Sequence, residues 1–239
     1  RDIDFSYVKG EQVLKHFDLW VKSGQKIAIV GATGSGKTTV VNLLTRFYDI
    51  DGGEITLDGR NITAIPRAKL RGSIGIVLQD TVIFNDTIAQ NIRYGRLDAT
   101  DEEVREAARL ARVDDFAEKL SAGYDTMLTE GGSNLSQGQR QLISIARAVL
   151  ADPKILILDE ATSSIDTRTE MHIQDAMINL MKGRTSLIIA HRLSTIRDAD
   201  KIVVISGGRV AEAGSHEELL AAKGCYYELY MSQFAGIAT

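Results

Sequence analysis

The chain has 239 residues, 44% hydrophobic and 25% charged, which is typical of a soluble globular protein large enough for one α/β domain or for a core with an inserted subdomain. Its formal net charge of −4 gives no electrostatic reason to expect a nucleic acid as partner. The single cysteine excludes an internal disulfide and a cysteine-based metal site, and no apolar run approaches the roughly 20 residues of a membrane-spanning helix.

The N-terminal stretch has the alternating pattern of half-buried strands. Residues 2–30 largely alternate apolar and polar positions, with a break at Ser23 and Gly24. This pattern predicts antiparallel strands that precede a first buried strand. Tyr7 lies on one of the predicted edge strands, and its spacing alone favours neither a packing role nor a binding role.

A glycine-rich motif follows the first buried strand. Residues 26–30 form a short apolar run, residues 31–38 spell G-x-x-x-x-G-K-T, and apolar side chains recur at helical spacing from Thr39 onward. Strand, glycine loop and helix form the context in which this motif binds the phosphates of a nucleoside triphosphate. An accidental glycine-rich turn is disfavoured, because the pattern is rare by chance in this context.

The chemistry of the loop explains its residue types. Glycines let successive backbone N–H groups turn toward one anion, and the helix N-terminus adds a partial positive charge. Lys37 is expected to reach the β- and γ-phosphates, and the Thr38 hydroxyl is expected to ligate Mg²⁺. The predicted nucleotide contacts of this segment are Gly31, Thr33, Gly34, Ser35, Gly36, Lys37, Thr38 and Thr39.

The middle of the chain changes from strand to helix. Residues 74–78 form a second apolar run that ends at Gln79, and ligands of α/β sheets gather at the carboxyl ends of strands. From about residue 87 the pattern becomes helical, with carboxylates in the first turn of one helix. We therefore predict a helical subdomain over residues 87–150, inserted into a core of residues 1–86 and 151–239.

Two carboxylates close the next apolar run. Residues 155–158 are consecutively apolar and lead into Asp159 and Glu160, as expected of a parallel strand buried on both faces. Beside a phosphate-binding loop, Asp159 can hold Mg²⁺ through its water shell, and Glu160 can orient or deprotonate an attacking water. The alternative is a strand that merely ends in solvated acids, which the preceding glycine motif disfavours.

A histidine ends the following strand. Residues 185–190 predict another buried strand, directly followed by His191. A lone histidine is more often structural than catalytic. At the carboxyl end of a strand that could neighbour the phosphate site, however, contact between His191 and the γ-phosphate is favoured. The remainder, residues 200–231, predicts a hairpin followed by helices.

A second motif identifies the family that the chain resembles. Residues 135–139 spell L-S-Q-G-Q and, with the glycine motif and the acidic strand, resemble the nucleotide-binding domain of ABC transporters over essentially the whole chain. The usual signature is L-S-G-G-Q, so Gln137 departs from it. Because that position supplies neither the serine hydroxyl nor the closing glycine amide, we expect function to survive. Residues 129–132, 164–166 and 190–193 resemble the exporter type of this domain.

The resemblance implies an α/β fold, in which a P-loop NTPase core with a parallel sheet carries an antiparallel β subdomain and an inserted helical signature subdomain. Two such domains pair head to tail around two ATP molecules, each held between one domain's phosphate loop and the other's signature. Closure then depends on ATP, because a second helix N-terminus and a serine hydroxyl meet the γ-phosphate. In this family the aromatic residue at the position of Tyr7 stacks on adenine. The signature side of the site is implied to include Ser136, Gly138, Gln139 and, further along, Asp166.

The implied function is ATP binding and hydrolysis that powers export across a membrane. The implied partners are a second nucleotide-binding domain, identical or different, and a membrane-spanning domain of the same full-length chain. The domain would lie at the cytoplasmic face of the cell membrane, with Gln79 and the helical insert facing the membrane-spanning domain. The implied catalytic residues are Lys37, Gln79, Glu160 and His191, and the implied Mg²⁺ ligands are Thr38, Gln79 and Asp159.

Two other functions remain as alternatives. A domain that binds ATP but scarcely hydrolyses it is disfavoured by Glu160 and His191. A soluble ABC ATPase of chromosome maintenance or translation would need coiled-coil insertions, a tandem domain or a basic surface, and the sequence has none of these.

Overall fold

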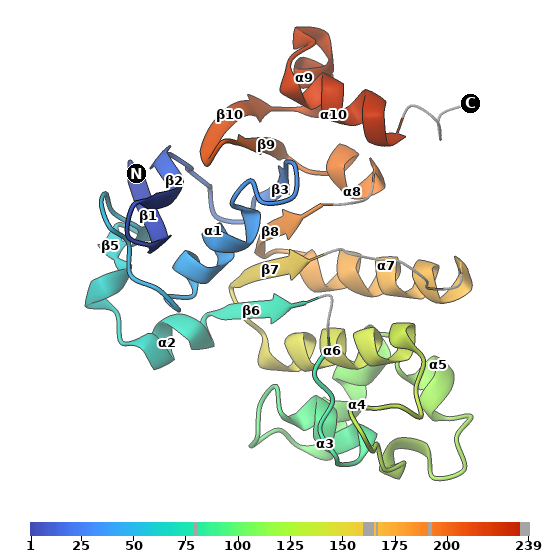
Figure 1. Cartoon of the computed structure of the whole chain (residues 1–239). Helices are drawn as coiled ribbons and strands as arrows, with labels where there is room; N and C mark the ends of the chain where they lie inside the picture. Colours follow the sequence, from blue (N-terminus) through green and yellow to red (C-terminus); the bar gives the residue numbers. More distant parts are fainter. Residues whose placement is uncertain (79–80, 160–164, 166, 191–192, 235–239) are drawn as a thin grey trace. The chain divides into compact units, whose positions relative to one another are not determined.

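A computed structural model describes residues 1–78, 81–159, 165, 167–190 and 193–234 (Figure 1). Contacts divide the chain into two compact units. Unit 1 comprises Arg1–Ile74 and Thr185–Thr239, and unit 2 comprises Gly75–Arg184. Each unit is described separately below. The division into a core of residues 1–86 and 151–239 with an insert of residues 87–150 stays a prediction.

The main sheet of unit 1 is built around β3 (Lys26–Val30). This strand lies between β8 (Thr185–Ile189) and β9 (Lys201–Ser206), and both neighbours run parallel to it (Figure 1). β10 (Arg209–Gly214) then pairs with β9 in antiparallel orientation. The apolar side chains of β3 are buried, as expected of a central parallel strand. The predicted buried strands and the predicted hairpin of this unit are therefore confirmed.

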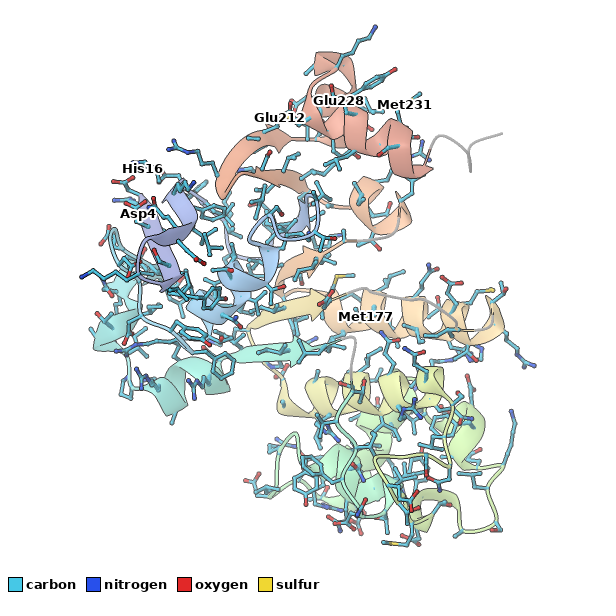
Figure 2. The ribbon with its side chains drawn as sticks, viewed as in Figure 1. Asp4, His16, Met177, Glu212, Glu228 and Met231 are labelled. Carbon is cyan, nitrogen blue, oxygen red and sulfur yellow. The ribbon has the colours of Figure 1, made fainter. Side chains whose placement is uncertain are left out.

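Antiparallel strands precede β3, as the alternating pattern predicts. β1 (Ile3–Val8) pairs with β2 (Glu11–Phe17), and the backbone N–H of His16 donates to Asp4 Oδ1 at 3.0 Å (both residues are labelled in Figure 2). A short second hairpin follows α1. The remaining elements of this segment are α1 (Lys37–Leu44), β4 (Thr56–Leu57), β5 (Arg60–Asn61), η1 (Ile62–Ala64) and α2 (Arg67–Gly72).

Helices close unit 1 at its C-terminal end. They are α8 (Leu193–Arg197), α9 (His216–Ala222) and α10 (Cys225–Phe234). Glu212 of β10 accepts hydrogen bonds from the first backbone N–H groups of α10, at 2.6 and 2.9 Å, and so joins the sheet to the helix (Figure 2). A carboxylate at this end of a helix also matches its positive pole.

Unit 2 is mostly helical. Its strands, β6 (Ile74–Val77) and β7 (Ile155–Asp159), are neighbours, and β6 begins at the boundary of the two units. Of the helices of unit 2, α6 has the most buried residues, and it packs against α3, α4 and α7. The buried Met177 lies on α7 (Figure 2). The helices are α3 (Ile88–Arg93), α4 (Asp101–Leu110), α5 (Asp114–Ala117), η2 (Gly123–Asp125), α6 (Gln137–Ala151) and α7 (Thr167–Met181).

The helix start predicted from carboxylates is confirmed at α4. Thr100 caps this helix, and its side chain and that of Glu103 form a reciprocal capping box. Such a box satisfies two backbone donors that the helix itself leaves free.

Among the described residues, no helix combines the length and apolar character needed to cross a membrane.

A buried asparagine organises the loop that leads into α3. Asn91 is fully buried, and its Oδ1 accepts from the backbone N–H of Phe84 at 2.9 Å while its Nδ2 donates to the carbonyls of Phe84 and Thr87 at 3.0 Å. Arg147 of α6 donates to Asn91 Oδ1 and to the Asn91 carbonyl, at 3.2 and 2.8 Å. This network ties residues 84–87 to two helices, and removal of Asn91 would leave several buried groups unpaired.

Replacement of Asn91 by alanine is expected to lower the free energy of unfolding by about 2–4 kcal/mol, because unpaired buried polar groups keep their desolvation cost. Asn179→Ala is the matched control: Asn179 of α7 accepts an exposed hydrogen bond from Lys182, just beyond the helix, and the loss of this bond is expected to cost about 0.5 kcal/mol or less. Urea unfolding followed by circular dichroism measures both. Equal midpoints for the two variants would show that the network does not stabilise unit 2.

Candidate nucleotide-binding site

The glycine loop joins β3 to α1 in unit 1. Gly36 is the N-cap of α1, with φ 110° and no side chain to accept hydrogen bonds from the first turn of the helix. The first N–H groups of a helix have no partner within the helix. No side chain caps these groups at the start of α1, and the helix dipole there favours negative charge.

Close packing, against backbone at one position and against a side chain at the other, explains two of the loop glycines. A Cβ at Gly31 would lie 2.4 Å from the Ile205 carbonyl oxygen, and a Cβ at Gly36 would lie 2.8 Å from Leu14 Cδ2. Gly36 also has a backbone conformation that L side chains rarely adopt. The loop is thus held against β9 and β2 at positions where only glycine fits without displacement of its neighbours.

The polar groups of the loop suit a phosphate. Lys37 Nζ donates to the carbonyls of Gly31 and Ala32, at 2.7 and 2.9 Å, so its ammonium lies over the loop itself. Ser35 is about nine-tenths buried, and its Oγ has no hydrogen-bond partner among the described residues. The side chains of Thr33 and Thr38 are exposed. A cation, an unpaired hydroxyl and open helix amides in one loop form an anion-binding arrangement.

Tyr7 lies against α1 in the same unit. Its hydroxyl accepts from Asn42 Nδ2 at 2.9 Å and contacts Thr39 Oγ1 at 3.2 Å. Its ring meets those of Phe5 and Tyr48 edge-on, with centroids 4.8 and 5.0 Å apart, yet Tyr7 stays 45% exposed. The structure therefore brings Tyr7 and the residues of the glycine loop to the same helix.

The signature residues begin α6 in unit 2. Ser136 is the N-cap, with Oγ accepting from the Gln139 N–H at 3.2 Å and the Gln139 side chain accepting from the Ser136 N–H at 2.9 Å. Since Ser136 Oγ accepts in this box, its hydroxyl hydrogen can still be donated elsewhere. Gly138 is buried, and a Cβ there would lie 2.2 Å from Thr169 Cγ2 of α7. Position 138 therefore requires glycine because α6 packs closely on α7 there, a requirement that was not predicted from the sequence.

Asp159 ends β7, as predicted. The three residues before it are buried, and Asp159 itself is only partly so. Its carboxylate offers oxygen ligands, the type that Mg²⁺ requires. The described residues hold no group of three or more His, Cys, Asp or Glu side chains placed for a metal.

Some predicted site residues cannot be placed. Gln79, Glu160, Asp166 and His191 lie outside the described residues. Asn42, in contrast, was not predicted as a site residue although it contacts Tyr7. The sequence carried one signal for it: a polar residue three positions after Thr39 lies on the same face of the helix.

Comparisons with known proteins agree with these motifs. The model of the ABC transporter family matches residues 14–163. The chain is 60% identical over 234 residues to the ABC transporter ATP-binding protein YfiC of Bacillus subtilis, covering 98% of the chain and 39% of that protein. It is 55% identical over 227 residues to a fatty acid ABC transporter ATP-binding/permease protein of Mycobacterium bovis, covering 95% of the chain and 36% of that protein.

A similar structure and a third relative extend the comparison. The ATP-dependent lipid A-core flippase of Syntrophus aciditrophicus is 52% identical over 234 residues, 98% of the chain and 39% of the flippase. A bacterial Atm1-family ABC exporter, solved with ATP bound, superposes with a TM-score of 0.92 at 45% identity, covering 100% of the chain and 42% of the exporter. The chain thus spans well under half the length of these relatives. The chain belongs to the ABC transporter family, as an ATP-binding and ATP-hydrolysing domain of the exporter type.

Proposed function

We propose that this domain powers transport of a substrate across a membrane by pairing head to tail with a second nucleotide-binding domain when ATP binds. One observation carries the proposal: the loop between β3 and α1 presents Lys37, the unpaired Ser35 hydroxyl and uncapped helix amides at one place. These groups favour a polyphosphate, since each is a donor or a positive charge. Relatives described as an ATP-binding/permease protein and as a flippase support a transport role.

The proposed phosphate contacts follow from the loop geometry. Backbone N–H groups of the loop and of the first turn of α1 donate to phosphate oxygens together with the Ser35 hydroxyl, and Lys37 exchanges its carbonyl partners in the loop for the β- and γ-phosphates. Tyr7, half exposed beside α1, stacks on the adenine. The contacts proposed here are those of Tyr7, Gly31, Thr33, Gly34, Ser35, Gly36, Lys37, Thr38 and Thr39.

Mg²⁺ is proposed as the second cofactor. Thr38, Gln79 and Asp159 would hold it, and when bound the ion neutralises phosphate charge as the terminal phosphoryl group departs. Glu160 follows Asp159 directly in the chain and would take the proton of the attacking water. His191 would donate a hydrogen bond to the γ-phosphate and steady it during transfer.

The start of α6 is proposed to complete the site of the partner domain. The hydroxyl hydrogen of Ser136 and the backbone N–H of Gly138 would act as donors to the γ-phosphate of the partner's ATP. The N-terminus of a helix also stabilises such a negative charge. Gln139 fixes the Ser136 side chain through the capping box, and Asp166 would add a further polar contact. Because each half lacks the other's donors, hydrolysis needs two domains and product release lets them separate.

A membrane-spanning domain is the second proposed partner. The M. bovis relative combines ATP-binding and permease parts in one name, and the chain covers 36% of it. We expect the corresponding full-length protein to place this domain at the cytoplasmic face of the cell membrane, with Gln79 and the helical segment of residues 87–150 toward the permease part. A high effective concentration then promotes pairing of two domains.

Lys37→Ala is expected to raise the Kd for Mg-ATP by about 10-fold or more, because a charge-assisted contact to phosphate is lost. Lys9→Ala, which removes an exposed lysine of the β1–β2 turn, is the matched control and should bind like wild type. Isothermal titration with Mg-ATP measures both, and circular dichroism checks that each variant is folded. Unchanged affinity of Lys37→Ala would contradict the assignment of the loop as the phosphate site.

Glu160→Gln is expected to bind ATP but to release phosphate about 10²- to 10⁴-fold more slowly, which is the typical loss when one general base is removed. Glu102→Gln, on an exposed position of α4, is the control and should hydrolyse ATP at the wild-type rate. A coupled phosphate-release assay measures the rates. Hydrolysis near the wild-type rate in Glu160→Gln would remove Glu160 from the mechanism.

Slow hydrolysis also predicts an accumulated dimer. Light scattering of Glu160→Gln with Mg-ATP should give twice the monomer mass, whereas the same variant without nucleotide should remain smaller. A monomer in both conditions, despite bound ATP, would show that two copies of this chain do not pair through ATP, and that a different partner chain is required.

A further inference from the structure

The hydroxyl of Tyr7 is held between two polar side chains of α1. Asn42 Nδ2 donates to it at 2.9 Å, and the hydroxyl lies 3.2 Å from Thr39 Oγ1. Thr39 and Asn42 are three residues apart, so they project from the same face of the helix. β1 and α1 are separated by almost thirty residues of chain, yet this one hydroxyl joins them.

The chemistry of the three groups sets the direction of the hydrogen bonds. The amide nitrogen of Asn42 is only a donor, so the Tyr7 oxygen accepts from it. The Tyr7 hydrogen is then free to point at Thr39 Oγ1. The Thr39 hydroxyl accepts this bond, and its own hydrogen can be donated onward. A directed chain therefore runs from Asn42 through Tyr7 to Thr39, a residue of the phosphate-binding segment.

The rest of the surroundings fixes the ring of Tyr7 without covering it. Phe5 and Tyr48 contact it edge-on, at interplanar angles of 86° and 87°. Two aromatic contacts and two hydrogen bonds leave the ring little rotational freedom, while 45% of the residue stays exposed. A ring that is already fixed loses less conformational entropy when a flat ligand stacks on it.

We propose that Asn42 is a positioning residue for nucleobase recognition: it holds the Tyr7 hydroxyl and, through Thr39, links the base platform to the helix that binds the phosphates. The inference rests on the proposed stacking of Tyr7 on adenine. Asn42 itself touches neither base nor phosphate. Its effect is to keep the Tyr7 ring and the phosphate loop in a fixed arrangement, so that the base and the phosphates of one nucleotide can bind at the same time.

A purely structural role for Asn42 makes a different prediction. If Asn42 only fastened β1 to α1, its loss would disturb the loop and weaken every phosphate ligand alike. If it positions the ring, its loss would weaken only ligands that carry a base. Inorganic tripolyphosphate has the three phosphates of ATP without its base and ribose, and it therefore separates an effect on the phosphate loop from an effect on the nucleoside end.

The test compares Mg-ATP and Mg-tripolyphosphate by isothermal titration, or by competition where binding is weak. Asn42→Ala suits the test because alanine favours the helix. It should raise the Kd for ATP about three- to tenfold, the range of one hydrogen bond, and change the Kd for tripolyphosphate less than twofold. Tyr7→Phe, which keeps the ring, should behave in the same way, and Asn179→Ala on α7 should change neither affinity.

Two further readouts sharpen the result. In the double variant Asn42→Ala with Tyr7→Phe, the loss should be close to that of Tyr7→Phe alone, because Tyr7→Phe already removes the bond from Asn42. In steady-state hydrolysis, Asn42→Ala should raise KM by the same three- to tenfold and leave kcat within twofold of wild type.

Each outcome decides between the two roles. Equal weakening of ATP and tripolyphosphate, additive losses in the double variant, or an unchanged Kd for ATP would overturn the positioning role. Tyr7→Leu tests the stacking on which the inference rests: if it left ATP affinity unchanged, stacking and positioning would both fail, while the phosphate site would stand. Failure of wild type to bind either ligand would instead overturn the proposed function as a whole.

Discussion

The close approach of backbone to backbone at the end of β3 is the constraint on which the rest of unit 1 depends. Gly31 passes so near the Ile205 carbonyl that a Cβ has no room, and Gly36 turns the chain into α1 with a left-handed conformation. The helix therefore starts without a side-chain cap, and its amides stay open to a ligand. The buried parallel neighbours of β3 hold this turn in place.

A capped helix performs the complementary task in unit 2. α6 has a full capping box, so its N-terminus is shaped by the protein itself, whereas α1 has no side-chain cap at the place proposed for the nucleotide phosphates. The two helix starts thus differ in a way that matches their proposed roles in one composite site. Gly138 adds a second reason for this geometry, since its lack of a side chain lets α6 and α7 pack closely. The same short motif thus serves helix packing in addition to its proposed role in phosphate recognition.

Local patterns made much of the fold predictable, while contacts across the chain stayed hidden. The apolar runs at β3, β7 and β8 and the glycine spacing before Lys37 are read within ten residues, and the structure confirms these strands and the helix after the loop. The contact between Asn42 and Tyr7 joins segments that are distant in the sequence, and the helical spacing of Asn42 from Thr39 does not indicate Tyr7 as the partner. The network of Asn91 and Arg147 is of the same kind. Roles that depend on a partner domain or on Glu160 and His191 remain predictions.

Hydrogen exchange of the backbone amides in the glycine loop, read by mass spectrometry with and without Mg-ATP, tests the central claim most directly. If the open amides before and at the start of α1 donate to phosphate, peptides that cover residues 31–44 should gain strong protection when ATP binds. Protection should be largest there within unit 1, with a second effect near Tyr7. ATP binding without any slowing of exchange in residues 31–44 would contradict the account, because the nucleotide would then be held elsewhere.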